Sequence, residues 1–189
     1  RDCLLSRGLG DVYKRQILNI SVGMLASARR EEQEELLAAI EAVWDAGIVV
    51  VAAAGNNGPK DKSITIPGLC RKIITVGSSD DEEGEVKNLG LMRGYSGRGP
   101  TEACIMKPEV VAPGTAIVSC KRMGNGYEMK SGTSMATPVV AGAVAVLLSR
   151  YSNLKPAEVK LRLYETSVDT GKSKHAQGWG RLDVMQLIR

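Results

Sequence analysis

The chain has no phenylalanine, only one histidine and an aromatic content of 4% over 189 residues. Nucleic-acid binding by base stacking needs aromatic side chains beside a basic stripe, and this sequence has neither, although its formal net charge is +4. A zinc site is not expected, because one histidine and four cysteines without a Cys-x-x-Cys pair do not supply the usual ligand spacing. The composition thus argues against nucleic acid as a partner and against bound zinc.

Long hydrophobic runs, a recognisable signal peptide and internal repeats are also lacking. No stretch reads as a membrane span, so no membrane partner is expected. The four cysteines, Cys3, Cys70, Cys104 and Cys120, could form two disulfides, but free thiols of a reducing compartment are the simpler interpretation. Free thiols favour the cytoplasm over secretion, and the location is otherwise open.

The first residues, 1–16, show neither a helical nor a strand period and contain no initiating methionine. We interpret them as a non-native leader or cloning scar, with a native surface arm as the alternative. The remaining residues, 17–189, are numerous and apolar enough for one sizeable core, with 43% hydrophobic residues in the whole chain. We therefore expect one domain over 17–189.

Apolar runs of strand length alternate with an amphipathic helical pattern in the first half of this domain. Residues 17–21, 48–54 and 72–77 are apolar and rich in β-branched side chains, which is typical of buried strands. Residues 31–46 carry apolar side chains at helical spacing and acids on the other positions. The order strand, helix, strand predicts an α/β fold with a mostly parallel sheet and helices on both faces.

A turn of small residues leads into a short apolar run between Ser131 and Leu148. The run is typical of a buried helix, which places Ser134 at a helix N-terminus. Backbone N–H groups there have no intrahelical partner and sit at the positive end of the helix dipole, so they could stabilise an oxyanion. Pro138 fits, because the N–H that it lacks would have bonded the carbonyl of Ser134. An ordinary N-cap serine on a core helix is the alternative.

Two segments resemble the subtilisin-like serine proteases, the subtilases. Residues 132–138 read Gly-Thr-Ser-Met-Ala-Thr-Pro, and residues 50–56 read Val-Val-Ala-Ala-Ala-Gly-Asn. The family usually has a histidine where Val139 stands. The resemblance covers about residues 17–188, the C-terminal part of a catalytic domain, and is nearest to the intracellular bacterial branch. It implies a subtilisin-like, three-layer fold that is incomplete at its N-terminus.

The resemblance also implies a site. Ser134 would be the nucleophile and the side-chain amide of Asn56 a donor to the oxyanion. The family binds an extended substrate beside the strand exit and places its side chain in a pocket of small residues. The residues that correspond to these substrate contacts are Ser21, Val22, Gly23, Ala52, Ala53, Ala54, Gly55 and Thr133.

The general base of such a reaction is missing from the sequence. In subtilases the aspartate and histidine of the triad precede the strand that begins here at Ile17. The only histidine, His175, stands in a polar segment, which indicates a surface residue. We therefore expect a serine endopeptidase acting on peptides or proteins, and we expect this fragment of it to be inactive by itself. A catalytically inactive relative that binds peptides and, less favoured, a nucleotide-binding α/β domain are the alternatives.

Two further expectations concern loops. The acidic loop of residues 80–85 could hold a structural calcium ion, but its spacing is not a calcium-loop pattern and a solvated turn is favoured. No other cofactor and no catalytic metal are expected. Relatives carry a cis proline where Pro67 stands, and the resemblance therefore implies a cis peptide bond before it.

Overall fold

A computed structural model of the chain describes residues 16–24, 30–82 and 92–189. Its centre is a four-stranded parallel sheet in the order β1-β2-β3-β4, which joins β1 (Ile17–Ile20), β2 (Val49–Ala53), β3 (Ile74–Ser78) and β4 (Val110–Ala112). Every residue of β2, β3 and β4 is buried, as expected for a parallel sheet covered on both faces. The predicted α/β class and the three predicted strands are confirmed.

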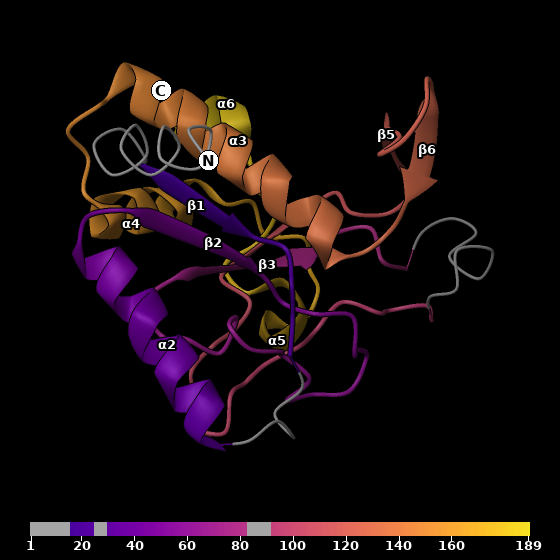
Figure 1. The fold of residues 1–189 in the computed structure, drawn as a ribbon, viewed down its shortest axis with the longest axis horizontal. Helices are drawn as coiled ribbons and strands as arrows, with labels where there is room; N and C mark the ends of the chain where they lie inside the picture. The colour runs from indigo at the N-terminus through magenta and orange to yellow at the C-terminus, as the bar shows by residue number, and fades with distance from the viewer. Residues whose placement is uncertain (1–15, 25–29, 83–91) are drawn as a thin grey trace, which may run out of the picture.

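Helices cover the sheet on both sides (Figure 1). Helix α3 (Thr133–Arg150) crosses one face and contacts all four strands, while α2 (Arg30–Asp45) and α4 (Pro156–Thr166) lie on the other side and contact β2. Two short helices, α5 (Lys174–Gln177) and α6 (Val184–Leu187), follow near the C-terminus. The predicted helix at residues 31–46 is thus confirmed as α2.

Helix α3 is the one helix of the described residues that is long and apolar enough, by composition alone, to cross a membrane. Its buried share of 44% and its packing along the sheet account for that composition, because a core helix needs apolar side chains on the face that it buries. Val140, Val144 and Leu147 form that face, each with 0% exposure. The same packing sets the position of the helix N-terminus above the strand ends.

A β-hairpin not foreseen from the sequence precedes α3. Strands β5 (Ile117–Cys120) and β6 (Tyr127–Lys130) pair antiparallel and stand apart from the main sheet (Figure 1). At the base of the hairpin, the Ser131 hydroxyl accepts a hydrogen bond of 2.8 Å from the N–H of Ala116. The hairpin therefore ends in a fixed turn that leads directly into α3.

A buried charge cluster of Lys107, Glu109 and Lys160 joins the far end of the sheet to α4. Lys107 Nζ lies 2.7 Å and 2.9 Å from the two Glu109 carboxylate oxygens, and Lys160 Nζ lies 2.9 Å from one of them. The Lys107 side chain is fully buried, and this burial lowers its pKa to about 8 against the opposing pull of Glu109. Glu109 is therefore a structural charge.

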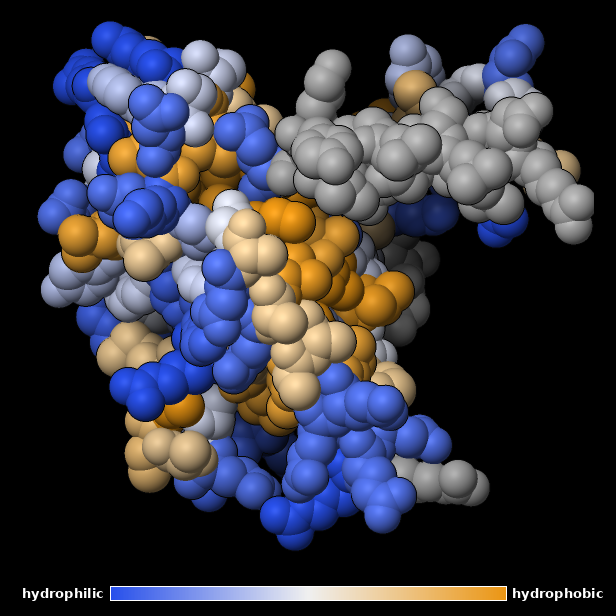
Figure 2. Space-filling model, turned by 60° about the vertical axis from the view of Figure 1, so that its left-hand side comes forward, coloured by the Kyte–Doolittle hydropathy of each residue, from blue (hydrophilic) through white to orange (hydrophobic). Residues whose placement is uncertain are grey.

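The peptide bond between Ile66 and Pro67 is cis, as expected. The segment interpreted as a leader, residues 1–16, lies outside the described residues except for Gln16. A space-filling view shows apolar side chains gathered in the middle of one face and bordered by hydrophilic ones (Figure 2). Within the described residues, β1 has a neighbouring strand on one side only, which makes it the edge of this sheet.

Candidate active site

Ser134 is the second residue of α3, and its hydroxyl points away from the helix. The hydroxyl donates a hydrogen bond of 2.9 Å to the carbonyl oxygen of Ser21, which follows β1. The N-cap position belongs to Gly132, whose φ of 146° favours glycine and which has no side chain of its own to cap the helix. Ser134 is therefore not an N-cap serine, and its hydroxyl lies beside the exit of the edge strand.

Asn56 lies across from this helix start, at the end of the segment after β2. Its Oδ1 accepts the backbone N–H of Thr133 at 2.9 Å and the Thr133 hydroxyl at 3.1 Å. A backbone N–H can only donate, so the atom facing it must be the carbonyl oxygen of the amide. The Asn56 Nδ2 donor is left without a hydrogen bond among the described residues, and it is available to an anion.

Of the first three backbone N–H groups of α3, two are hydrogen-bonded within the protein and one is not. Thr133 N–H goes to Asn56, and Met135 N–H goes to the carbonyl oxygen of Gly132 at 2.9 Å. The N–H of Ser134 has no acceptor within the described part of the chain. Two free donors, Ser134 N–H and Asn56 Nδ2, thus flank the nucleophile at the positive end of the helix dipole.

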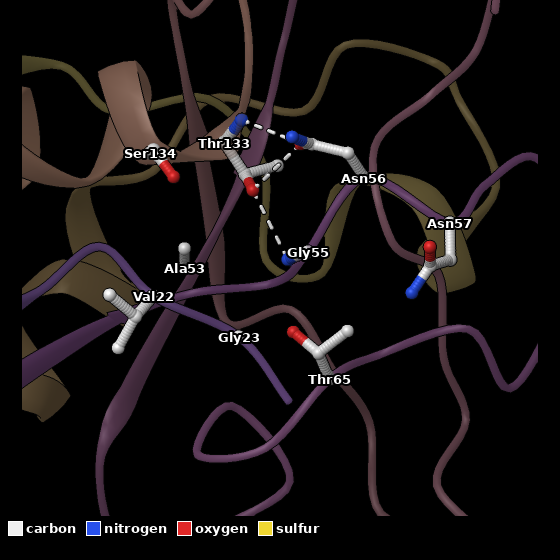
Figure 3. A pocket seen from close by; sticks show the side chains of 9 residues that line it. All are labelled: Val22, Gly23, Ala53, Gly55, Asn56, Asn57, Thr65, Thr133 and Ser134. Atoms are coloured by element: carbon white, nitrogen blue, oxygen red, sulfur yellow. Dashed lines mark hydrogen bonds between the residues drawn. The ribbon is translucent and has the colours of Figure 1, made fainter. Parts of the chain in front are cut away.

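A cavity of about 210 Å³ opens beside Ser134 (Figure 3). Its lining combines the start of α3 with the segments that follow β1 and β2. The lining residues are Val22, Gly23, Ala53, Gly55, Asn56, Asn57, Thr65, Thr133 and Ser134.

Five of the eight residues expected to contact substrate line this cavity, and three do not. Ser21 contributes its carbonyl oxygen to the Ser134 hydroxyl instead. Ala52 and Ala54 are fully buried and lie outside the cavity, which corrects their expected placement. Successive side chains of a strand point to opposite faces, so only Ala53 of this run can face the site. The contacts of the lining residues with substrate stay a prediction.

Two lining residues, Thr65 and Asn57, were missed from the sequence. Thr65 stands in an apolar segment before Pro67 that reads only as the approach to a strand. Nothing local connects it with Ser134, because β3, β4 and the whole hairpin lie between the two residues in the chain. Asn57 directly follows Asn56, and this adjacency was the one available signal.

The single histidine does not serve Ser134 within the described residues. His175 Nδ1 lies 2.9 Å from Asp61 Oδ2, both side chains are about half exposed, and neither lines the cavity. The expectation of a surface histidine is therefore confirmed. Ser134 has no general base among residues 16–24, 30–82 and 92–189.

Two of the three described acids of the 80–85 loop, Asp80 and Asp81, are hydrogen-bonded to protein donors. Asp80 Oδ1 accepts hydrogen bonds from the Ser78 hydroxyl and from the N–H groups of Gly114 and Thr115, at 2.8 Å, 2.8 Å and 3.0 Å. The buried Asp81 accepts from Ser96 N–H and Lys172 Nζ. Calcium prefers six to eight oxygen ligands, and these two carboxylates are already engaged by protein donors.

Comparison with known proteins decides the family. The sequence model of the subtilase family matches residues 11–180. The chain belongs to the subtilases.

Among curated relatives, the subtilase chain is 38% identical to serine protease AprX of Bacillus subtilis over 178 residues, which is 87% of this chain and 40% of AprX. It is 34% identical to subtilisin DY of Bacillus licheniformis, over 89% of this chain and 55% of that protein. The chain thus spans about half the length of these relatives or less.

Solved structures agree with this assignment. The prenylagaramide maturation protease PagA matches with a TM-score of 0.72 and 26% identity, over 97% of this chain and 66% of PagA. A mutant of the protease domain of PatA matches with a TM-score of 0.70 and 27% identity, over 97% of this chain and 62% of PatA. The subtilase therefore has a subtilisin-like fold and corresponds to the C-terminal part of the catalytic domain.

Proposed function

We propose that this subtilase is a serine endopeptidase that cleaves peptide bonds through an acyl intermediate on Ser134. The observation that carries the proposal is the pair of free donors beside the Ser134 hydroxyl: the N–H of Ser134 itself and the Asn56 amide, which Thr133 holds by its carbonyl end. Both donors would stabilise the negative charge that develops on a tetrahedral intermediate formed at Ser134. A binding protein without chemistry has no need of that arrangement.

The reaction would proceed by acyl transfer. Ser134 Oγ attacks the carbonyl carbon, its proton passes to a general base, and the carbonyl oxygen becomes an oxyanion held by Asn56 Nδ2 and Ser134 N–H. The peptide nitrogen then leaves with a proton, and water releases the acyl group from Ser134 by the same steps. The segment after Ser21 would pair with the extended substrate backbone.

The base has to come from a residue other than His175, because that histidine is bonded to Asp61 away from the cavity. This feature favours a second candidate function, a catalytically inactive subtilase that binds peptides. The two candidates share the substrate class, peptides or proteins, and differ only in whether Ser134 is activated.

A fluorophosphonate probe separates them, because it reacts with an activated serine and not with an ordinary one. We expect the natural gene product to be labelled at Ser134, with labelling abolished in Ser134→Ala. The matched control is Ser149→Ala, which removes an exposed hydroxyl from the other end of the same helix. Peptide binding without labelling of the wild type would support the inactive candidate instead.

A further inference from the structure

Two asparagines of the chain are each followed by a glycine, in the pairs Asn57–Gly58 and Asn125–Gly126. Asparagine loses its side-chain amide most readily in such a pair, because glycine has no side chain to hinder attack by its own backbone nitrogen. Both asparagines are exposed to solvent. Local sequence and exposure therefore do not distinguish the two pairs, and the difference has to lie in how the fold holds the glycine nitrogen.

The backbone nitrogen of Gly58 is held in place. Its N–H donates a hydrogen bond of 2.9 Å to the carbonyl oxygen of Tyr95. The backbone around it is closely packed, because a Cβ atom added to Gly58 would overlap the carbonyl oxygens of Ser96 and Gly94. The Gly58 nitrogen therefore cannot turn toward the Asn57 side chain unless this hydrogen bond breaks and the neighbouring backbone moves.

The backbone nitrogen of Gly126 is free by comparison. Asn125 and Gly126 lie at the tip of the hairpin β5–β6, which stands apart from the main sheet (Figure 1). The N–H of Gly126 has no acceptor in the described part of the chain, and a Cβ atom added to this glycine would meet nothing within 4 Å. Only its carbonyl oxygen is engaged, by the N–H of Lys121 at 3.1 Å. The Gly126 nitrogen can therefore approach the Asn125 side chain without opening packed structure.

We propose that Asn125 is a site of spontaneous covalent modification, deamidation through a cyclic imide, and that the fold protects Asn57 from the same reaction. The Gly126 nitrogen forms a bond to Asn125 Cγ, the bond from Cγ to Nδ2 breaks, and ammonia leaves with the proton of the Gly126 N–H. Water then adds to one of the two imide carbonyl groups and opens the ring to aspartate or isoaspartate. The reaction consumes water alone.

The modification changes both charge and backbone at the hairpin tip. A neutral amide becomes a carboxylate close in sequence to the cations Lys121 and Arg122, and isoaspartate adds one CH2 group to the backbone of the turn. No residue of this tip lines the cavity beside Ser134. The inference is therefore independent of the peptidase function proposed for Ser134.

The test follows both asparagines in the full-length natural gene product carrying Ser134→Ala, a substitution that prevents self-digestion during a long incubation. The folded protein is kept at mildly alkaline pH, and peptide mapping by mass spectrometry measures conversion of each amide to a carboxyl group. We expect Asn125 to convert at least about tenfold faster than Asn57, because Gly58 must first break its hydrogen bond and open its surroundings. In denaturant the two asparagines should convert at similar rates.

Asn125→Gln is the matched control, because glutamine keeps the amide but would have to close a larger ring. It should abolish the change at residue 125 and leave the slow conversion of Asn57 as it was. Equal conversion of the two asparagines in the folded protein, or none at Asn125, would overturn the inference. The protective role of the fold would be refuted if Asn125 were faster by the same factor in denaturant, since local sequence would then explain the difference.

Discussion

The backbone N–H of Thr133 and the side-chain oxygen of Asn56 are joined by a hydrogen bond of 2.9 Å, and the Thr133 hydroxyl adds a second of 3.1 Å. The same hydroxyl accepts the N–H of Gly55 at 3.1 Å. These bonds fix which end of the Asn56 amide faces Ser134. Thr133 is thus a positioning residue that aims a donor toward the site without touching the reacting atoms itself.

Replacing Thr133 by valine tests this role. Valine keeps the backbone N–H and the volume but removes the hydroxyl that bonds Gly55 and Asn56, and each lost hydrogen bond is worth about 0.5–1.5 kcal/mol. We expect kcat to fall by about 3- to 30-fold with little change in KM, since the bond acts through the oxyanion donor. Thr133→Ser, which keeps the hydroxyl, should retain most of the activity. A rise in KM with unchanged kcat would contradict the positioning role.

The buried lysine of the charge cluster makes stability depend on pH. The unfolded chain keeps the Lys107 proton up to about pH 10.5, whereas the folded protein, with a pKa of about 8, releases it earlier. The unfolded state binds more protons between these values, so the free energy of unfolding rises with pH across this window. Loss of the Lys107 proton therefore adds stability on the order of 3 kcal/mol. This gain in the free energy of unfolding is complete above about pH 10.5 and is lost as the pH falls through about 8.

Denaturant unfolding between pH 7 and 10.5 measures this slope. We expect the free energy of Lys107→Met to rise less with pH than that of the wild type. Lys72→Met is the matched control, because its ammonium group is solvent-exposed and paired with Asp45 at the surface. If the free energy of unfolding of Lys72→Met rises with pH as little as that of Lys107→Met, the buried lysine is not the source of the pH dependence.

Glu109 carries more of the stability than surface acids do. Its carboxylate is 4% exposed, meets both Lys107 and Lys160, and accepts the N–H of Thr75 at 2.8 Å. Glu109→Gln would leave two ammonium groups without their counter-charge, and removing one partner of a buried ion pair costs about 3–5 kcal/mol. Glu34→Gln breaks an exposed pair on α2 instead, and we expect a loss of about 1 kcal/mol or less. Equal losses of unfolding free energy in Glu109→Gln and Glu34→Gln would contradict this prediction.

The fit between Gly23 and Thr65 can be tested by a double-mutant cycle. Gly23→Ala alone should destabilise the protein by about 1–3 kcal/mol, because its methyl group would lie 2.4 Å from Thr65 Oγ1 and 3.1 Å from Thr65 Cβ. Adding Thr65→Gly removes both atoms and should recover much of that loss relative to Thr65→Gly alone. Thermal unfolding of the four proteins gives the coupling free energy. Strictly additive effects would mean that the two residues do not compete for the same space.

The sequence by itself determined the layered order of this protein. Apolar runs and the helical period of residues 31–46 are local patterns, and β1, β2, β3 and α2 follow them within two residues. The hairpin β5–β6 escaped because its two strands are only four residues long and mostly exposed, too short for a periodic pattern to stand out. Ser134 and Asn56 were found because each stands in a long family segment.

Only the tertiary structure decided how the site is assembled. Three contacts assemble it: Asn56 with Thr133, Ser21 with Ser134, and Thr65 with Gly23 and Gly55. The partners in each contact are separated in the chain, and no local pattern encodes these contacts. The pleat of β2 divided the run Ala52–Ala54 between two faces, which a reading of consecutive small residues could not do. Sequence patterns specify which elements form, whereas cavity shape and donor direction depend on the packing of one element against another.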